Sequence, residues 1–123
     1  RWSGKKRVSN YNIGTAFYNI DIELINLLDD LNMWEKTNTP ILEIIVFLHH
    51  RLVKIHPFLN GNGRWARMIV NIYLRQKQFP LLKWNELKLT KVSSFRKNYI
   101  KALRDADKGN YSNLISIHKN LFE

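Results

Sequence analysis

The chain contains no cysteine, only three prolines and only five glycines among its 123 residues. The absence of cysteine excludes disulfide bonds and thiolate nucleophiles, and it fits a reducing cytoplasm. No apolar run approaches the roughly 20 residues that a membrane-spanning helix requires, so no membrane partner is expected. The chain begins on Arg1 without a methionine or an apolar leader. We therefore predict no signal peptide, and we expect that a segment precedes residue 1.

Acidic residues are also scarce, because ten of them stand against 20 lysines and arginines, which gives a net charge of +10. Such a charge attracts nucleotides, nucleic acids, acidic proteins and anionic lipids alike. A solvated, lysine-rich face explains this charge more simply than a dedicated surface for RNA or for an acidic partner. Charge alone does not separate these interpretations.

The spacing of apolar residues predicts a mainly α-helical single domain over residues 1–123, with one short β-hairpin near the N-terminus. The mixed composition of residues 7–17 favours a hairpin or an extended flap. The first helix is expected to follow Asp21 and to turn Ile22, Ile25, Leu28 and either Leu31 or Met33 inward. A polar connection is expected over residues 32–39. The other predicted helices run over about 41–55, 62–78, 93–106 and 112–122, and the first of these should be buried on most sides.

The helix over 62–78 is expected to bury Ala66, Ile69, Val70, Ile72, Tyr73 and Leu74, and the helix over 93–106 to carry Tyr99 among its apolar residues. Residues 84–86 fit no pattern and are not assigned to an element.

Residues 56–67, His-Pro-Phe-Leu-Asn-Gly-Asn-Gly-Arg-Trp-Ala-Arg, concentrate the chemically capable side chains of the sequence. The histidine of this stretch accepts a proton near neutral pH. Gly61 and Gly63 permit close approach of the backbone, and the N–H groups of a turn and a helix start together form an anion site. Arg64 and Arg67 share one helix face, and guanidinium groups match phosphate oxygens in pairs. This combination suits catalysis at a phosphate better than core packing.

The stretch resembles the signature of the Fic family, His-x-Phe-x-(Asp/Glu)-Gly-Asn-Gly-Arg-x-x-Arg. Seven typed positions agree at fixed spacing, namely His56, Phe58, Gly61, Asn62, Gly63, Arg64 and Arg67. The segments around residues 2–14 and 99–111 also resemble the family, so the likeness covers nearly the whole chain. Within the family, the likeness is to the small bacterial branch called mobile mystery protein B. The resemblance implies a compact helical bundle with a hairpin flap.

By this resemblance, the chain transfers AMP from ATP to a Ser, Thr or Tyr hydroxyl of a target protein, and pyrophosphate leaves. His56 is the implied general base for that hydroxyl. Gly61, Asn62 and Gly63 would bind the α-phosphate. Arg64 would bind the β-phosphate and Arg67 the γ-phosphate.

The other three histidines are not expected to take part. A histidine by itself more often serves packing than catalysis, and the adjoining anion site is what distinguishes His56. His49, His50 and His118 lie in no motif, so we expect packed or surface positions for them. The spacing of the first two to His56 also lacks the i, i+4 pattern of a helical zinc pair.

Asn60 is the one departure from the signature, because the family carries an acid there that holds Mg²⁺. Mg²⁺ prefers hard and usually anionic oxygen ligands. An amide oxygen still ligates, so we expect weaker metal affinity and slower transfer rather than complete loss. Two other interpretations stay open: this branch uses another metal ligand or donor nucleotide, or the chain is inactive.

The sequence indicates less about how a target is recognised and how the activity is regulated. Residues 10–17 are expected to hold a target segment by strand pairing, with Asn12 and Ile13 in contact with it. Many relatives are blocked by a helix that carries (Ser/Thr)-x-x-x-Glu-(Gly/Asn), and residues 39–44 match it in type except at the last position. The inhibitor is therefore expected on a preceding segment, on an acidic antitoxin-like partner of this toxin-like chain, or nowhere.

Two alternative functions remain. Relatives that phosphorylate their targets or transfer other phosphate-linked groups share the signature, although the pair Gly63 and Arg64 favours AMP transfer. The alternative from another class is a non-catalytic module that binds a partner or nucleic acid through its basic charge. The sequence shows neither a helix-turn-helix pattern nor an aromatic pair set out for base stacking, so nucleic acid is not the expected partner.

Overall fold

The computed structural model describes residues 19–55 and 62–122, and these ranges form a mainly helical fold, as predicted. The helices are α1 (Ile20–Lys36), α2 (Ile41–Ile55), α3 (Asn62–Gln76), α4 (Glu86–Thr90), α5 (Ser94–Asp107) and α6 (Ser112–Leu121). The hairpin expected within residues 7–17 lies outside the described residues. Inside them, β pairing is limited to an isolated antiparallel bridge between Leu82 and Phe122, so the hairpin gains no support. None of the described helices is long and apolar enough to cross a membrane.

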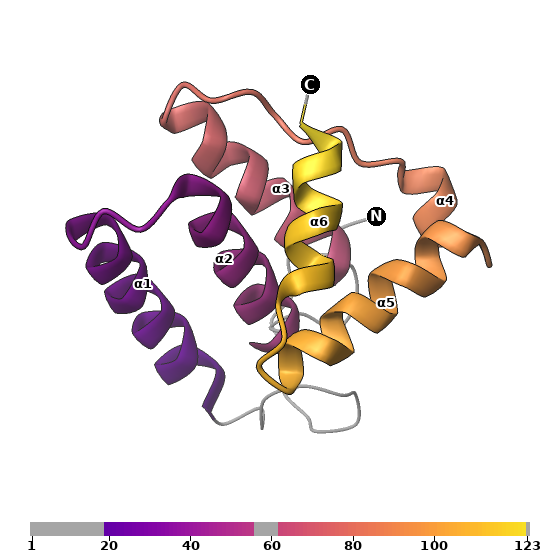
Figure 1. The fold of residues 1–123 in the computed structure, drawn as a ribbon. Coiled ribbons are helices and arrows are strands. Elements are labelled where there is room, and N and C mark those ends of the chain that lie inside the picture. Colours follow the sequence, from indigo (N-terminus) through magenta and orange to yellow (C-terminus); the bar gives the residue numbers. More distant parts are fainter. Residues whose placement is uncertain (1–18, 56–61, 123) are drawn as a thin grey trace.

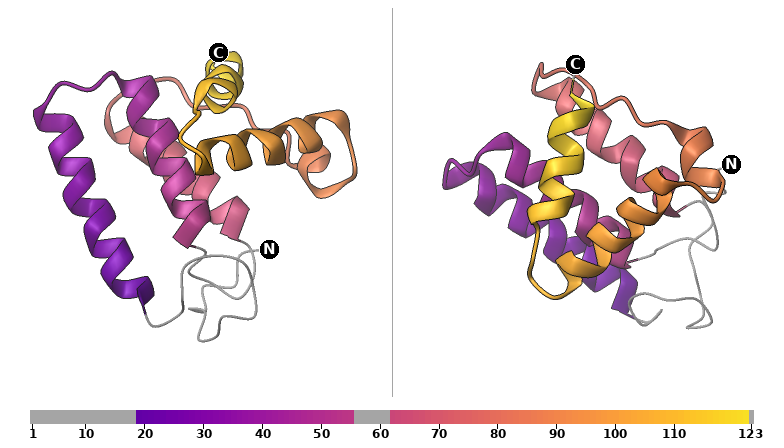
Figure 2. Two further views of the ribbon diagram at one scale, coloured as in Figure 1. Left: turned by 60° about the horizontal axis from the view of Figure 1, so that its bottom comes forward. Right: turned by 45° about the vertical axis from the view of Figure 1, so that its right-hand side comes forward.

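Helix α2 is the centre of the fold, because it packs against α1 and α3 and also against α6. Figure 1 shows α6 crossing in front of α2 and α3, and Figure 2 shows α1 on one side of α2 with α5 and α6 on the other. The buried apolar residues of α2 are Ile44, Ile45, Val46, Leu48, Leu52 and Ile55. These residues belong to two hydrophobic clusters. One cluster is shared with α1 and α3, and the other, to which Val46 belongs, is shared with α5 and α6. The prediction that this helix is buried on most sides is confirmed.

Helix α1 turns a different face inward from the predicted one. Ile22, Ile25 and Leu28 are 57%, 58% and 60% exposed, whereas Ile20 and Leu27 are buried. The expected and the observed faces differ because α1 carries apolar residues on more than one side. Packing against α2 selects the buried face. Part of this packing is the contact of Trp34, close to the end of α1, with the ring of Phe47 in α2, whose centroids lie 5.5 Å apart. The helix also continues to Lys36, through the polar connection predicted from residue 32.

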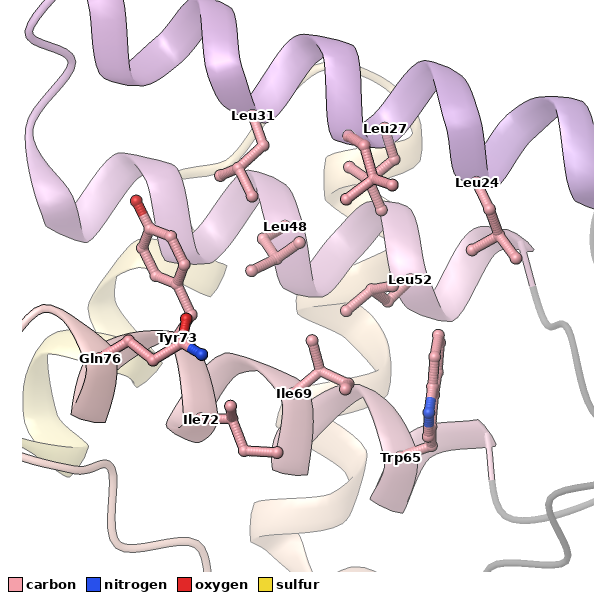
Figure 3. Close-up of a pocket in the computed structure, with 11 residues that line it drawn as sticks. Leu24, Leu27, Leu31, Leu48, Leu52, Trp65, Ile69, Ile72, Tyr73 and Gln76 are labelled. Carbon is pink, nitrogen blue, oxygen red and sulfur yellow. The ribbon is translucent and has the colours of Figure 1, made fainter.

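An apolar groove of about 400 Å³ runs between α1, α2 and α3 (Figure 3). Leu24 and Leu31 line it from α1, and Trp65 and Ile69 line it from α3. Ile72 also lies on this groove and is 45% exposed, so its predicted burial is wrong. The other buried positions predicted for α3 are confirmed at Ala66, Val70, Tyr73 and Leu74, with Ile69 partly buried.

The segment after α3 returns along that helix and brings α4 to it. The side chain of Asn71 fixes this path, since its amide donates to the Leu82 carbonyl at 3.1 Å and its oxygen accepts from the Leu82 N–H at 2.9 Å. Asn85 then caps α4 by accepting from the N–H of Lys88 at 3.1 Å. Glu86 is thereby presented at the first position of α4, facing α3.

Candidate nucleotide-phosphate site

The described part of the predicted site lies at the start of α3. Gly63, Arg64 and Arg67 belong to this helix, which begins at Asn62, as the sequence predicts. The other predicted site residues lie outside the described residues, namely Asn12, Ile13, His56, Asn60 and Gly61. Their roles stay predictions of the sequence.

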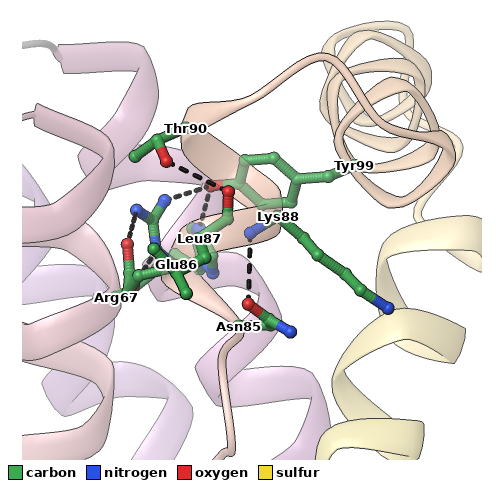
Figure 4. Close-up of polar contacts among 8 residues, drawn as sticks. Arg67, Asn85, Glu86, Leu87, Lys88, Thr90 and Tyr99 are labelled. Carbon is green, nitrogen blue, oxygen red and sulfur yellow. Dashed lines mark hydrogen bonds and ion pairs between the residues drawn. The ribbon is translucent and has the colours of Figure 1, made fainter.

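The guanidinium of Arg67 is held by side chains from two other helices (Figure 4). Its Nε donates to Glu86 Oε2 at 2.8 Å and its Nη2 donates to Glu86 Oε1 at 2.5 Å. Its Nη1 lies 3.4 Å from the hydroxyl of Tyr99 in α5. The rings of Trp84 and Tyr99 each lie 5.8 Å from the guanidinium carbon, within the range of cation–π attraction. Arg67 is therefore a fixed group and not a mobile surface arginine.

Gly63 makes room for this guanidinium. A Cβ atom at this position would lie 3.0 Å from Arg67 Nη1, closer than ordinary van der Waals contact. The side chain of Arg67 therefore folds back over the first turn of its own helix. Its charge lies beside backbone N–H groups that have no partner within the helix. Both features favour an anion at this end of α3.

The ion pair between Arg67 and Glu86 is charged under ordinary conditions. Burial by itself lowers the pKa of Arg67, but the hydrogen bonds to Glu86 and the neighbouring Tyr99 raise it above its usual value overall. The hydrogen bond from Arg67 lowers the pKa of Glu86, against the opposing effect of burial. A buried guanidinium needs such a counter-charge, because an unpaired buried charge is costly.

Arg64 and Arg67 line one open hollow of about 510 Å³, together with Lys83, Trp84 and Glu86. The shared face that their spacing predicted is therefore confirmed. The volume lies within the usual range of small-molecule sites. Three cationic side chains and one carboxylate line it, so its charge favours an anionic ligand.

Behind Arg67, the hydrogen bonds continue into the core. Tyr99 OH lies 2.8 Å from His49 Nε2, and His49 Nδ1 lies 2.9 Å from His118 Nε2. His118 Nδ1 lies 2.7 Å from the carbonyl of Leu114. Both histidines are fully buried, which agrees with the packed alternative of the prediction, but they are hydrogen-bonded to each other as well as packed.

Sequence reasoning missed Glu86, Tyr99 and the two histidines behind them as neighbours of the site. Glu86 stood in a segment that no pattern typed, and Tyr99 was expected only as a core residue. Nothing local in the sequence signals these contacts.

Metal binding finds no support within the described ranges, where no group of three or more His, Asp or Glu side chains could hold an ion. Glu86, the one acid on the hollow, is engaged by Arg67. The predicted metal ligand Asn60 lies outside the described residues.

The sequence matches the Fic/DOC family over residues 4–74, more than half of its length, and the chain belongs to this family. It is 32% identical over 91 residues to a Fido domain-containing protein of Dictyostelium discoideum, covering 72% of this chain and 58% of that protein. It is 34% identical over 58 residues to the protein adenylyltransferase fic-1 of Caenorhabditis elegans, covering 47% of this chain and 11% of the relative. The narrower likeness to the mobile mystery protein B branch stays a prediction.

Solved structures share the fold. Fic-1 (residues 134–508) of Caenorhabditis elegans superposes with a TM-score of 0.73 at 23% identity, over 96% of this chain and 33% of that one. A Fic domain-containing signalling protein of Bacteroides thetaiotaomicron gives a TM-score of 0.69 at 23% identity, over 89% and 43%. The chain thus spans 58% or less of the length of each of these relatives.

Proposed function

We propose that this chain is a protein adenylyltransferase, which transfers AMP from ATP to a hydroxyl side chain of a target protein. The single observation that carries the proposal is that Arg64 and Arg67 line one hollow at the start of α3, directly after the signature loop. The family membership and the activity named for its Caenorhabditis relative support it. The sequence has no cysteine, which fits the cytoplasm as the place of this reaction.

In the proposed reaction, a hydroxyl oxygen of the target attacks the α-phosphorus of ATP while His56 accepts the hydroxyl proton. The bond between the α-phosphorus and the oxygen bridging to the β-phosphate breaks, and that oxygen leaves with pyrophosphate. A positioned base contributes roughly 10²–10⁴-fold to such a step. Asn12 and Ile13 are proposed to hold the target segment so that its hydroxyl faces His56.

The arginines are proposed to stabilise the charge that develops on pyrophosphate. A guanidinium has five N–H donors. Among the described residues, Arg67 uses three of them, two toward Glu86 and one toward Tyr99. The remaining two lie one on each terminal nitrogen, and they are proposed to donate to oxygens of a terminal phosphate. Arg64 is exposed on the same hollow and is proposed to bind the preceding phosphate. Preorganised donors of this kind contribute on the order of 3 kcal/mol each.

Mg²⁺ is proposed as the cofactor, with Asn60 as its weak protein ligand beside Gly61 and Asn62. When bound, the ion supplies positive charge to the phosphate oxygens. The regulator is proposed to be a separate antitoxin-like protein or a segment outside this chain, because residues 39–44 lie in and just before the central helix α2.

Labelled ATP tests the proposal and separates it from the related phosphotransferase. The chain is incubated with Mg²⁺, cell extract and ATP labelled at either the α- or the γ-phosphate. We expect label on protein from the α-phosphate only, loss of label with His56→Ala and strong loss with Arg64→Ala. Arg75→Ala, an exposed arginine at the other end of α3, is the matched control and should retain the activity.

Other results point elsewhere. Label from the γ-phosphate only indicates a phosphotransferase of the same family. No label, together with RNA binding that falls steeply with salt, supports the non-catalytic binding module instead.

A further inference from the structure

The hydrogen bonds behind Arg67 form one continuous chain that ends at the backbone of α6. From the guanidinium it passes through Tyr99 of α5 and His49 of α2 to His118 of α6, and then to the Leu114 carbonyl. The chain thus links the arginine of the hollow to three helices that do not line it.

One arrangement of protons satisfies every member of this chain. A carbonyl oxygen only accepts, so His118 Nδ1 carries a proton and donates it to Leu114. In neutral His118, Nε2 then accepts, which requires a proton on Nδ1 of His49. His49 Nε2 is left to accept from the Tyr99 hydroxyl, and the Tyr99 oxygen turns a lone pair toward Arg67 Nη1.

The opposite order leaves the Tyr99 hydroxyl proton without a partner in this chain of hydrogen bonds. If His118 carried a second proton, His49 would have to accept at Nδ1 and donate from Nε2 to the Tyr99 oxygen. The Tyr99 oxygen would then accept from both His49 and Arg67, and its own proton would have no acceptor among these residues. Burial of both imidazoles lowers their pKa values and keeps the favourable neutral order.

We propose that Tyr99 and His49 are positioning residues for Arg67. The proton order behind the guanidinium offers it an acceptor on the side away from Glu86, and so fixes the direction of its remaining N–H groups. This inference rests on the proposed role of Arg67 as a phosphate ligand. It assigns a functional part to His49, for which the sequence predicted only a packed or surface position.

His50 provides the contrast that separates positioning from packing. It is buried beside His49 on α2, but its Nε2 lies 2.7 Å from Asp107, and no hydrogen-bonded path among residues 19–55 and 62–122 joins it to Arg67. Its Nδ1 has no hydrogen-bond partner within the described residues. Substitution of His50 therefore disturbs the same helix without touching the chain behind Arg67.

The first experiment reads the proton order without any activity. Nitrogen-15 NMR of the histidine rings in the wild-type chain distinguishes a proton on Nδ1 from one on Nε2. We expect His49 and His118 both to carry their single proton on Nδ1 at pH 7. A proton on Nε2 of His49 would overturn the proposal.

The second experiment measures ATP affinity by calorimetry in the presence of Mg²⁺. Tyr99→Phe is expected to weaken ATP binding about two- to tenfold, as for one lost hydrogen bond. In the Arg67→Gln background the same change should have no further effect, because the group it positions is gone. His49→Leu should match Tyr99→Phe, His49→Gln should partly restore affinity through its amide oxygen, and His50→Gln should bind as the wild type does.

The outcomes separate the two proposals. If Arg67→Gln weakens ATP binding while Tyr99→Phe acts equally in both backgrounds, the positioning role is wrong and the phosphate role stands. If the wild-type chain binds no ATP although the NMR shows the expected tautomers, the proposed function fails and the positioning role fails with it. Thermal unfolding of each variant checks that it is folded, and the His49 pair replaces Tyr99→Phe if that variant is not.

Discussion

Arg67 and Glu86 form a bidentate ion pair in which the arginine side chain is 9% exposed and the glutamate side chain is 41% exposed. Loss of the carboxylate charge leaves a buried guanidinium without its counter-charge. We predict that Glu86→Gln lowers the free energy of unfolding by about 1–2 kcal/mol, less than for a fully buried pair because Glu86 is partly solvated. Urea unfolding at pH 7 measures this change.

The pair formed by Lys101 and Asp105 provides the control. It spans one turn of α5 at 3.3 Å, and the lysine side chain is 67% exposed. Lys101→Gln is expected to change the free energy of unfolding far less than Glu86→Gln does, because water screens an exposed pair. Equal losses for Lys101→Gln and Glu86→Gln would mean that Glu86 contributes no more than a surface charge.

The second prediction concerns Gly63, which lies within α3. Alanine is favoured over glycine by up to about 1 kcal/mol in a helix interior, and Gly63, as the second residue of α3, should show a smaller part of this difference. Here the new methyl group would press on Arg67 Nη1 at 3.0 Å, and the guanidinium cannot retreat without loosening its bonds to Glu86. We therefore predict that Gly63→Ala gives no stabilisation and weakens ATP binding. In the Arg67→Ala background the same substitution should stabilise the chain, and a stabilisation of equal size in both backgrounds would contradict the steric argument.

The burial of α2 could be predicted from sequence because this helix carries apolar residues on nearly all sides. No choice between a buried and an exposed face was needed. On α1, by contrast, Ile22, Ile25 and Leu28 compete with Ile20 and Leu27 for the core. Period alone admits both faces, and tertiary packing selects the second.

The site divides in the same way. Gly63, Arg64 and Arg67 lie within five consecutive positions, so their meeting at the start of α3 follows from helix geometry alone. Glu86 and Tyr99 reach Arg67 from 19 and 32 residues along the chain. Such contacts depend on how α4 and α5 return to α3, which no pattern in a single sequence states.

The third prediction tests the departure at Asn60. An aspartate would restore an anionic oxygen ligand for Mg²⁺, so Asn60→Asp is expected to lower the Mg²⁺ concentration for half-maximal AMP transfer and to raise the rate at limiting metal. A titration of Mg²⁺ against incorporation of α-labelled phosphate measures both. Asn62→Asp, two positions away, controls for the added charge, and it should not reproduce the gain. The same metal dependence in wild type and Asn60→Asp would exclude Asn60 as a ligand.

The last prediction follows from the two histidines behind Arg67. Burial, partly opposed by the bond to Leu114, lowers the pKa of His118 from 6.5 to about 4. Burial, and then the proximity of His118, lowers the pKa of His49 well below 6.5. Between pH 6.5 and 4 the unfolded chain therefore binds protons that the folded chain does not, and stability falls as the pH falls through this window. The stability that depends on neutral His49 and His118 is fully present above about pH 6.5.

The shift of His118 alone corresponds to roughly 3 kcal/mol lost by pH 4. Urea unfolding between pH 7 and pH 5 avoids most of the carboxylate titration, because ordinary carboxyl groups titrate near about pH 4. The hydrogen bond from Arg67 lowers the pKa of Glu86 below 4.5, so Glu86 also stays charged in this window. We expect His118→Gln to be less stable than the wild type at pH 7 but to lose less stability on acidification, since glutamine does not titrate. A pH dependence in His118→Gln as steep as that of the wild type would show that this imidazole is not held neutral by the fold.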